Sequence, residues 1–318
     1  MLELSIVVPV YNEVESVEAL YAQIHAALEK LGRTYEVVLV DDGSTDGTWE
    51  KLAALSRQFP KLRVIRFRGN FGQTAAMSAG FHAAQGDVVI TLDADLQNDP
   101  ADIPLLLAKM AEGFDVVSGW RKDRQDPFIN RRLPSMLANG MISKSTGVAL
   151  HDYGCTLKAY KRSVIRDVHL YGEMHRFIPA LCAWVGATVG EVPVNHRARQ
   201  FGTSKYGISR TFRVVLDLMT VKFLMRYSRG PMQIFGGIGI AFAGAALLML
   251  GVLIVDRLFG LADPFLLKRP FWVITPLMFM GFALQFICVG LLAEIQIRTW
   301  HESQNKPVYV IKETLPKA

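Results

Sequence analysis

The stretch DVVITLDADLQNDP, residues 87–100, decides the fold expected for this chain. Its apolar half is rich in β-branched residues and ends abruptly in two carboxylates, Asp93 and Asp95, which stand two positions apart. A short apolar run of this composition predicts a buried strand. Because two carboxylates at the end of such a strand repel each other, we expect them to share a partner that removes the repulsion.

Four more runs of the same kind occur in the first 120 residues, and helical patterns separate them. The runs are LSIVVPV, EVVLVDD, LRVIRF and DVVSGW, and the helical segments cover 14–31, 46–58, 73–84 and 102–112. This alternation is typical of βαβ units. We therefore expect an α/β fold with a mostly parallel, Rossmann-like sheet, whose ligands bind beyond the carboxyl ends of the strands.

Polar turns follow three of these runs and should converge at that edge of the sheet. They are YNE at 11–13, DDGSTDG at 41–47 and DAD at 93–95. The second turn has two readings that can hold together: Asp46 caps the next helix, and Asp41 or Asp42 hydrogen-bonds a base or ribose. Neither GxGxxG after the first run nor GxxxxGK[ST] occurs, so a bound diphosphate would be held by a metal and basic side chains.

The spacing of Asp93 and Asp95 lets them reach one cation and one ribose together. A hard divalent ion, Mg²⁺ or Mn²⁺, would remove their repulsion and leave coordination positions for phosphate oxygens, with Gln97 as a neutral helper. Surface acids also match a DxD pattern by chance. Here the pattern ends a buried strand beside two other polar turns, and this context favours a metal site.

The C-terminal third carries most of the apolar excess of a chain that is 51% hydrophobic. Residues 232–255 and 271–293 contain no charge, and each segment is long enough to cross about 30 Å of hydrocarbon. Buried core helices are the alternative, which the length and all-round apolarity of the segments argue against. The N-terminal MLELSIVVPV contains an acid and is interrupted by Pro9, so it predicts a strand rather than a signal peptide.

Charge and cysteine content narrow the partners. Lys and Arg exceed Asp and Glu by 35 − 29, or +6, and basic residues gather beside the first apolar segment, which favours anionic lipid over nucleic acid. Basic residues are fewer in the loop between the two segments than outside them, which predicts that both termini are cytosolic. The three cysteines lack the spacing of a disulfide framework or a zinc site.

Two further patterns concern the membrane. Residues 208–229 predict an amphipathic helix in the bilayer surface, with an ordinary domain helix as the alternative. Its apolar side carries Ile208, Phe212, Val215, Met219 and Phe223. A stripe of small residues at helical spacing, Gly237, Ala241 and Ala245, indicates helix packing, including packing between subunits, and we expect a homo-oligomer.

Seven stretches together resemble glycosyltransferase family 2. In order they are VPVYNE, VDDGSTD, TLDADLQNDP, SGWR, RRLPS, HDYGCTLKAYKR and RQFGTSKYG. With the two apolar segments they resemble the polyprenyl-phosphate glycosyltransferases, which include dolichol-phosphate mannose synthase and bacterial bactoprenol-phosphate glucosyltransferases. The resemblance covers nearly the whole chain. It implies a GT-A-type nucleotide-sugar domain and an inverting, metal-dependent transfer of a hexose to polyprenyl phosphate.

The resemblance also implies roles for individual residues. The nucleotide-sugar pocket would contain Pro9, Tyr11, Glu13, Asp42 and Asp93, with Asp93 at the ribose. Asp95 and Gln97 would hold the metal, and Arg121, Arg131 and Ser135 would bind the acceptor phosphate. The catalytic set would be Asp95, Asp152, Arg199 and Lys205, the last two on a basic loop that closes over both substrates. Lys158 stands where many eukaryotic relatives carry Arg, so a cation remains but the bidentate fork is lost.

Asp152 lies where a general base is expected by analogy with relatives that use alcohol acceptors. A phosphate monoester has a second pKa near ~6 and is largely dianionic at neutral pH, so its oxygen attacks without losing a proton. We therefore expect Asp152 to orient sugar or acceptor more than to remove a proton. Arg131 and Ser135, one helical turn apart, suit a phosphate monoester, with solvated surface residues as the alternative.

The expected donor is UDP-glucose and the expected acceptor is undecaprenyl phosphate, with GDP-mannose or a modified UDP-sugar as alternatives. A processive polysaccharide synthase would need more spans and a QxxRW-type motif before them, whereas QIRTW at 296–300 follows the last apolar segment. A non-catalytic membrane scaffold or sugar-nucleotide sensor is the remaining alternative, which the acidic and basic residues disfavour.

Four parts are expected along the chain, which we place in the cytoplasmic (inner) membrane. They are a cytosolic glycosyltransferase domain at 1–206, an amphipathic juxtamembrane helix at 207–230, a two-helix transmembrane hairpin at 231–298 and a cytosolic tail at 299–318.

Overall fold

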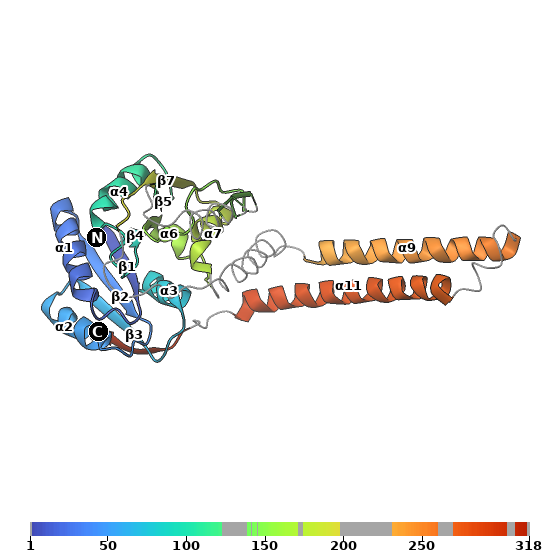
Figure 1. Cartoon of the computed structure of the whole chain (residues 1–318), viewed down its shortest axis with the longest axis horizontal. Helices are drawn as coiled ribbons and strands as arrows, with labels where there is room; N and C mark the ends of the chain where they lie inside the picture. Colours follow the sequence, from blue (N-terminus) through green and yellow to red (C-terminus); the bar gives the residue numbers. More distant parts are fainter. Residues whose placement is uncertain are drawn as a thin grey trace. The chain divides into compact units, whose positions relative to one another are not determined.

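The structure is a computed structural model, and it describes residues 2–122, 139–140, 142–144, 146–170, 174–197, 231–259, 270–303 and 309–316. The chain divides into two compact units. The first comprises Met1–Lys222 together with Pro307–Ala318, and the second comprises Phe223–Lys306. Figure 1 shows the sheet and helices of the first unit and the two long helices of the second.

One eight-stranded sheet forms the first unit. Its strands are β1 (Leu4–Val10), β2 (Tyr35–Asp41), β3 (Leu62–Phe67), β4 (Val88–Thr91), β5 (Val116–Trp120), β6 (Lys158–Lys161), β7 (Val189–Pro193) and β8 (Ile311–Leu315). They lie in the order β7-β5-β6-β4-β1-β2-β3-β8. The first four strands are parallel to one another, and β6 is antiparallel to both of its neighbours, β4 and β5.

The order of the first strands sets the place where a ligand can bind. From β1 the chain moves outward to β2 and β3, and then returns to place β4 on the other side of β1. Such a reversal is the topological switch point of a doubly wound sheet, where ligands bind beyond the carboxyl ends of the strands. The turn that contains Asp93 and Asp95 follows β4 directly and therefore lies at this point.

Helices connect these strands, as the alternating sequence pattern predicts. In chain order they are α1 (Val17–Leu31), α2 (Thr48–Gln58), α3 (Gln73–Ala83), η1 (Pro100–Asp102), α4 (Ile103–Ala111), α6 (Arg162–Ile165), η3 (Met174–Arg176) and α7 (Ile178–Trp184). α1 ends at Gly32, whose φ of 66° lies in the left-handed region that glycine adopts without strain. The N-cap of α2 is Gly47 rather than the predicted Asp46, but Asp46, one residue earlier, accepts a hydrogen bond from the Thr48 backbone N–H at 3.0 Å.

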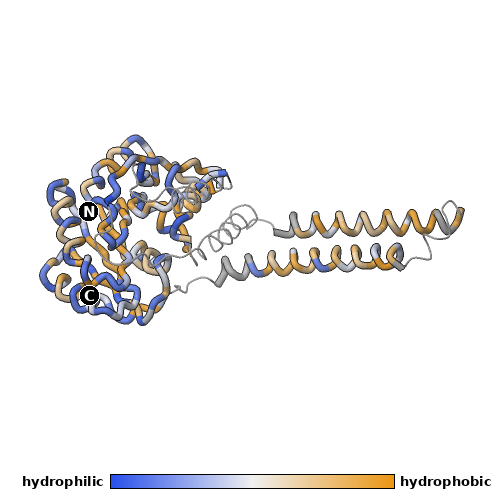
Figure 2. Tube along the Cα trace, viewed as in Figure 1, coloured by the Kyte–Doolittle hydropathy of each residue, from blue (hydrophilic) through white to orange (hydrophobic). Residues whose placement is uncertain are grey.

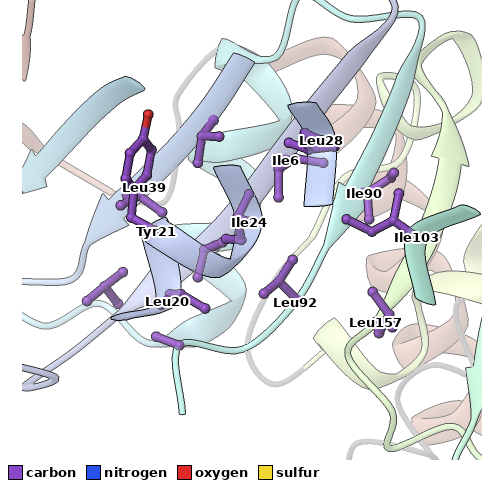
Figure 3. Close-up of a cluster of buried hydrophobic side chains, with 14 of the residues drawn as sticks. Ile6, Leu20, Tyr21, Ile24, Leu28, Leu39, Ile90, Leu92, Ile103 and Leu157 are labelled. Carbon is purple, nitrogen blue, oxygen red and sulfur yellow. The ribbon is translucent and has the colours of Figure 1, made fainter. Parts of the chain in front are cut away.

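The core lies where α1 packs on the sheet. Leu20, Ile24 and Leu28 recur at helical spacing on α1 and are fully buried against strand residues such as Ile6 and Ile90 (Figure 3). Each such side chain contributes roughly 1.5–3 kcal/mol when it is removed from water. A second helix, α3, also packs closely on β1. A Cβ at Gly80 of α3 would collide with the Val7 side chain, so only glycine allows this close approach.

The strand β8 was not predicted. It lies in the segment expected to be only a tail, and it pairs antiparallel with β3, with Ile65 opposite Thr314 and Arg66 opposite Glu313. β8 therefore belongs to the sheet of the first unit, although all of the second unit precedes it in the chain. Long-range pairing of this kind leaves no local signal in a sequence beyond the short alternating run itself.

The second unit contains α9 (Pro231–Phe259) and α11 (Pro270–Ser303). Within them, Phe235–Val255 and Ile274–Ala293 are long and apolar enough to cross a membrane. Only 11% and 17% of their most apolar stretches are buried. The two predicted apolar segments therefore form exposed helices rather than core helices, and Figure 2 shows their hydrophobic colouring.

Small residues pack α9 against α11, but they are not the predicted stripe. Gly239 lies so close to Ala283 and Ile287 of α11 that an added Cβ would come within 2.8 Å of Ile287. Gly237 and Ala241 are instead exposed in the hairpin. Two of the three residues of the stripe are therefore not buried between these two helices, and packing between subunits stays a prediction.

Candidate active site

Two turns at the carboxyl edge of the sheet are bound together by backbone and side-chain hydrogen bonds. Asn12, which follows β1 with φ of 53°, donates its backbone N–H to Ser44 Oγ at 2.9 Å and accepts from the Thr45 backbone N–H at 2.9 Å. Glu13 donates its N–H to Thr48 Oγ1 at 2.9 Å. The YNE and DDGSTDG turns therefore form one rigid frame, as their convergence predicts.

Asp42 fixes a third loop at this edge. It is 3% exposed, and its two carboxylate oxygens accept from the backbone N–H groups of Phe71 and Gly72 at 2.7 and 2.9 Å. Burial raises the pKa of Asp42 to about 6, although the two amides act in the opposite direction. The predicted nucleotide residue Asp42 thus holds the loop of residues 68–72 in place.

The same loop contacts the acids that follow β4. The residue after Gly72, Gln73, donates its side-chain amide to Asp93 Oδ1 at 2.8 Å. Three consecutive residues, 71–73, therefore bind both Asp42 and Asp93. We call Asp42, Asp93 and Asp95 the acidic edge, because the structure brings these predicted residues together at the switch point.

Asp93 and Asp95 show the repulsion that their spacing implies. Burial, and after it the charge of Asp95, raise the pKa of Asp93 to about 6. The charges of Arg121 and Lys158 act in the opposite direction. The second acid, Asp95, accepts the backbone N–H of Gln97 at 3.1 Å.

These acids fit a divalent metal that is shared with a substrate. Among the residues that the structure describes, no group of three or more His, Cys, Asp or Glu side chains could hold a metal ion. Mg²⁺ commonly binds through one or two carboxylates and takes its other ligands from substrate phosphates and water. The donor set of the acidic edge suits that arrangement.

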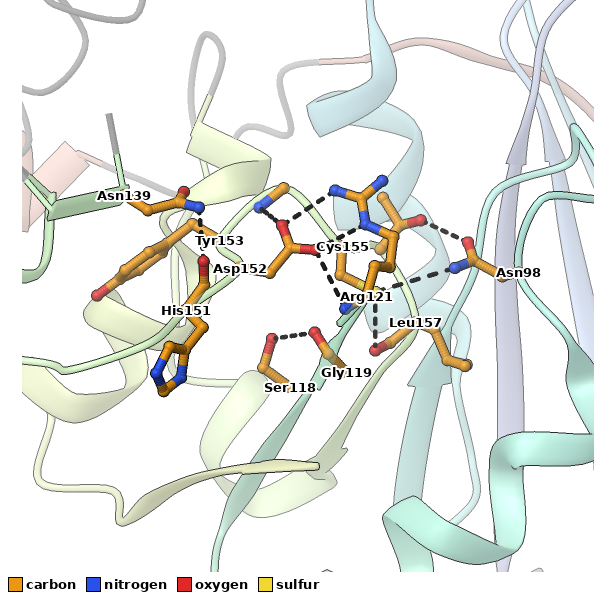
Figure 4. Close-up of polar contacts among 12 residues, drawn as sticks. Asn98, Ser118, Gly119, Arg121, Asn139, His151, Asp152, Tyr153, Cys155 and Leu157 are labelled. Atoms are coloured by element: carbon orange, nitrogen blue, oxygen red, sulfur yellow. Dashed lines mark hydrogen bonds and ion pairs between the residues drawn. The ribbon is translucent and has the colours of Figure 1, made fainter. Parts of the chain in front are cut away.

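Arg121 and Asp152 form a buried bidentate ion pair (Figure 4). Arg121 Nε and Nη2 donate to the two carboxylate oxygens of Asp152 at 2.7 and 3.0 Å, and Gly154 donates its backbone N–H to Asp152 Oδ1 at 3.0 Å. Burial alone would lower the pKa of Arg121, but the hydrogen bonds and charge of Asp152 outweigh it and the pKa is raised. The sequence motifs SGWR and HDYGC contained both residues but no sign of their pairing.

Lys158 supports the loop that carries Asp152. It is 2% exposed, and its ammonium donates to the backbone carbonyls of Tyr153, at 3.2 Å, and of Cys155. Burial lowers the pKa of Lys158. The compact ammonium of a lysine can donate to two backbone carbonyls in this way. A lysine therefore suits this position without the bidentate geometry of an arginine.

The chain before the predicted basic loop is attached to the DADLQND turn. Arg197 donates its backbone N–H to Gln97 O at 3.0 Å, and its guanidinium pairs with Asp99 and with Gln23 Oε1. Asn195 binds Asp102 through its backbone and side-chain nitrogens at 2.6 and 2.8 Å. The sequence analysis did not predict these contacts, although Asp99 lies within the stretch 87–100 and Asp102 lies two residues after it.

The remaining predicted residues divide into two groups. Pro9 is the one half-buried residue of β1, Tyr11 is 37% exposed in the following turn, and Glu13 accepts the Ser16 hydroxyl at 2.7 Å. Four predictions lie outside the described residues: Arg131, Ser135, Arg199 and Lys205, as does the amphipathic helix at 207–230.

The doubly wound sheet and the acidic edge define a GT-A-type nucleotide-sugar domain. Residues 5–168 match the family described as "Glycosyl transferase family 2". The chain belongs to this family and, within it, to the polyprenyl-phosphate glycosyltransferases.

Curated relatives match nearly the whole chain. It is 44% identical over 316 residues to dodecaprenyl-phosphate galacturonate synthase of Rhizobium johnstonii, covering 98% of this chain and 93% of the relative. It is 38% identical over 312 residues to undecaprenyl-phosphate 4-deoxy-4-formamido-L-arabinose transferase of Edwardsiella ictaluri, covering 98% and 94%.

Solved structures share the fold of the first unit. Glucosyl-3-phosphoglycerate synthase from Mycobacterium tuberculosis, in complex with Mn²⁺ and UDP-glucose, gives a TM-score of 0.55 at 18% identity and covers 69% of this chain and 78% of its own. Mannosyl-3-phosphoglycerate synthase from Rubrobacter xylanophilus gives 0.56 at 19% identity and covers 70% and 74%. These similarities confirm the predicted GT-A fold.

Proposed function

We propose that this enzyme transfers a sugar from a nucleotide diphosphate donor to polyprenyl phosphate at the cytoplasmic face of a membrane. The observation that carries the proposal is the acidic edge at the switch point of the sheet, next to the buried pair of Arg121 and Asp152. The names of the two relatives support the lipid phosphate acceptor.

The proposed reaction is one displacement at the anomeric carbon. An oxygen of the lipid phosphate forms a bond to this carbon while the bond to the nucleotide diphosphate breaks, which inverts the configuration. The attacking oxygen carries no proton at neutral pH, so the enzyme needs to orient the phosphate and not to deprotonate it.

Charge stabilisation is then the main task of the protein. Mg²⁺ or Mn²⁺, when bound, would neutralise the departing diphosphate. Asp95 with Gln97 would hold the ion, Asp93 would bind the ribose, and Pro9, Tyr11, Glu13 and Asp42 would form the nucleotide pocket. Arg199 and Lys205 would add positive charge at the diphosphate.

The engagement of Asp152 supports an orienting role over a base. Both of its carboxylate oxygens accept hydrogen bonds from Arg121, so a substrate proton would have to displace one of them. We propose that the pair presents Arg121 to the acceptor phosphate, with Arg131 and Ser135 as further ligands. A guanidinium that binds a carboxylate through Nε and Nη2 still has donors on Nη1.

The place of β8 supports the membrane topology. Because β8 pairs with β3, strands that precede α9 in the chain and the strand that follows α11 belong to one sheet, and these strands must lie on the same side of any membrane. Two crossings by the hairpin satisfy this condition, whereas one crossing does not. We therefore propose that α9 and α11 both span the inner membrane and that both termini are cytosolic.

The sugar is the finer part of the proposal. The resemblance in sequence favours glucose from UDP-glucose, but the two relatives are named for galacturonate and for 4-deoxy-4-formamido-L-arabinose. We propose a UDP-linked donor and give a sugar acid or modified pentose precedence over glucose, because these relatives match the chain from end to end.

The test is transfer by the purified full chain in nanodiscs. Undecaprenyl phosphate and Mg²⁺ or Mn²⁺ would be supplied with UDP-glucose, UDP-galacturonate, UDP-4-deoxy-4-formamido-L-arabinose or GDP-mannose in turn, and the lipid product identified by mass spectrometry. We expect one UDP-sugar to give a lipid product whose formation stops with EDTA. Absence of any lipid-linked sugar with all four donors, or turnover unchanged by EDTA, would contradict the proposal.

A further inference from the structure

The segment that follows α11 contributes more than a strand to the first unit. Tyr309, two residues before β8, is 9% exposed and stacks on Phe67 with ring centroids 5.0 Å apart and planes 12° from parallel. The Arg68 backbone N–H donates to Val310 O at 3.0 Å. Residues 309 and 310 therefore contact β3 at its carboxyl end, where the loop of residues 68–72 begins.

An aromatic contact continues from there into the loop. Phe67 meets Phe71 edge to face, with centroids 5.7 Å apart and planes at 87°. Phe71 in turn donates its backbone N–H to Asp42, and Gln73 binds Asp93. Tyr309 is thus three contacts away from Asp42, through Phe67 and Phe71.

The loop itself is tightly constrained from the other side. A Cβ at Gly43 would lie 2.7 Å from the Gly69 carbonyl oxygen, so the Asp42 turn and the loop touch backbone to backbone. Phe71 nevertheless remains 42% exposed. The loop of residues 68–72 is therefore held by Asp42 at its C-terminal end and by the segment of Tyr309 and Val310 at its N-terminal end. The side chain of Phe71 remains accessible to a ligand.

We propose that Tyr309 is a positioning residue for the nucleotide of the donor, which acts by holding Phe67 and through it the loop of residues 68–72. The inference rests on the proposed function, because it assigns the acidic edge to the donor. It gives the segment after the membrane hairpin a role in substrate binding, and it ties the second hairpin helix, α11, to the donor site through a short stretch of chain.

A purely structural role would have a different signature. Val310 and Ile311 are 50% and 44% exposed, so β8 buries little apolar side-chain area of its own. A tail that only covered the edge of β3 would lower the amount of folded enzyme, and with it the apparent kcat, and would leave both KM values unchanged. A positioning role affects the binding of the nucleotide and leaves the acceptor untouched.

The test compares three variants of the full chain in nanodiscs. Tyr309→Ala removes the stacked ring, Tyr309→Phe keeps it, and Val310→Ala is the matched control in the same segment. Loss of an aromatic pair should raise the donor KM by about 3- to 10-fold in Tyr309→Ala. The acceptor KM should stay within about 2-fold, and the other two variants should stay within about 2-fold of the parent for both substrates.

An unchanged donor KM in Tyr309→Ala, or an equal rise in both KM values, would overturn the proposal. Should Tyr309→Ala fail to fold, Tyr309→Leu keeps an apolar side chain without the ring, and the same outcomes apply. Calorimetric binding of UDP and GDP to parent and variant separates this proposal from the proposed function. A parent that binds nucleotide but transfers no sugar contradicts the function alone, whereas equal nucleotide affinity in parent and variant contradicts the role of Tyr309.

Discussion

The two units of the chain differ in which groups they bury and which they expose. In the first unit polar side chains such as Asp42, Asp152 and Lys158 are buried, and each has partners for its charge or its hydrogen bonds. In the second unit large apolar side chains such as Leu248 and Leu258 are exposed, at 70% and 72%. Water would penalise the exposed apolar side chains of the second unit, whereas hydrocarbon would penalise exposed charges of the first, such as Glu18 and Glu29. The two units are therefore built for different solvents.

The largest expected effect comes from breaking the buried pair in the first unit. Arg121→Ala leaves Asp152 without its bidentate partner and should destabilise the protein by about 3–5 kcal/mol, seen as a lower midpoint of thermal unfolding in nanodiscs. Arg162→Ala is the control, because Arg162 is 43% exposed, lies 3.8 Å from an exposed Asp87, and should cost at most about 1 kcal/mol. Equal decreases of the unfolding midpoint in both variants would mean that the ion pair of Arg121 and Asp152 contributes no more to stability than an exposed pair.

The next effect concerns the acidic edge. Asp95→Asn keeps the shape of the side chain but removes a charge that opposes Asp93 and holds the proposed metal. We expect kcat to fall about 10²–10³-fold. Asp87→Asn, at an exposed acid just before β4, is the control and should leave kcat unchanged. Full activity in Asp95→Asn would remove the metal from the mechanism.

The contrast in solvent can be tested with one substitution in each unit. Leu248→Arg places a charge near the middle of the α9 window and should cost about 2.5–3.5 kcal/mol of membrane insertion, seen as a smaller inserted fraction in a glycosylation-mapping assay. Leu105→Arg changes an exposed leucine of α4, and the amount of folded protein should be unchanged. If both changes are tolerated, α9 does not lie in hydrocarbon.

The smallest effect is a pH dependence of donor binding. Asp42, with a pKa of about 6, is ionised above this pH and then accepts most strongly from the amides of Phe71 and Gly72. The donor KM should therefore rise several-fold as pH falls from 7 to 5, and the rise should be smaller in Asp42→Asn, in which Asp93 still titrates over this range. Because this pKa is raised from 3.8, the same group lowers folding stability as pH rises from about 4 to 6 and has no further effect above that. A KM that is flat in the parent would leave Asp42 outside the donor site.

The sequence predicted those features that depend on local periodicity. The parallel strands, the helices between them, the apolar hairpin helices and the position of Asp93 and Asp95 at one sheet edge all follow from alternation and turn residues. The partner of Arg121 lies 31 residues away, and the partner strand of β8 lies about 250 residues away, so no local pattern marks either contact. For the same reason the role of Asp42 in holding the loop of residues 68–72 was not predicted.

The antiparallel pairing of β8 also makes the membrane hairpin an insertion into the sugar-transferring domain. A shortened protein that stops before residue 231 would lose its last strand and leave β3 as a bare, unpaired border, which invites pairing with other chains. Replacing 231–306 by a Gly/Ser linker would instead retain the closing strand. Of the two shortened versions, only the second should stay monodisperse after purification in detergent.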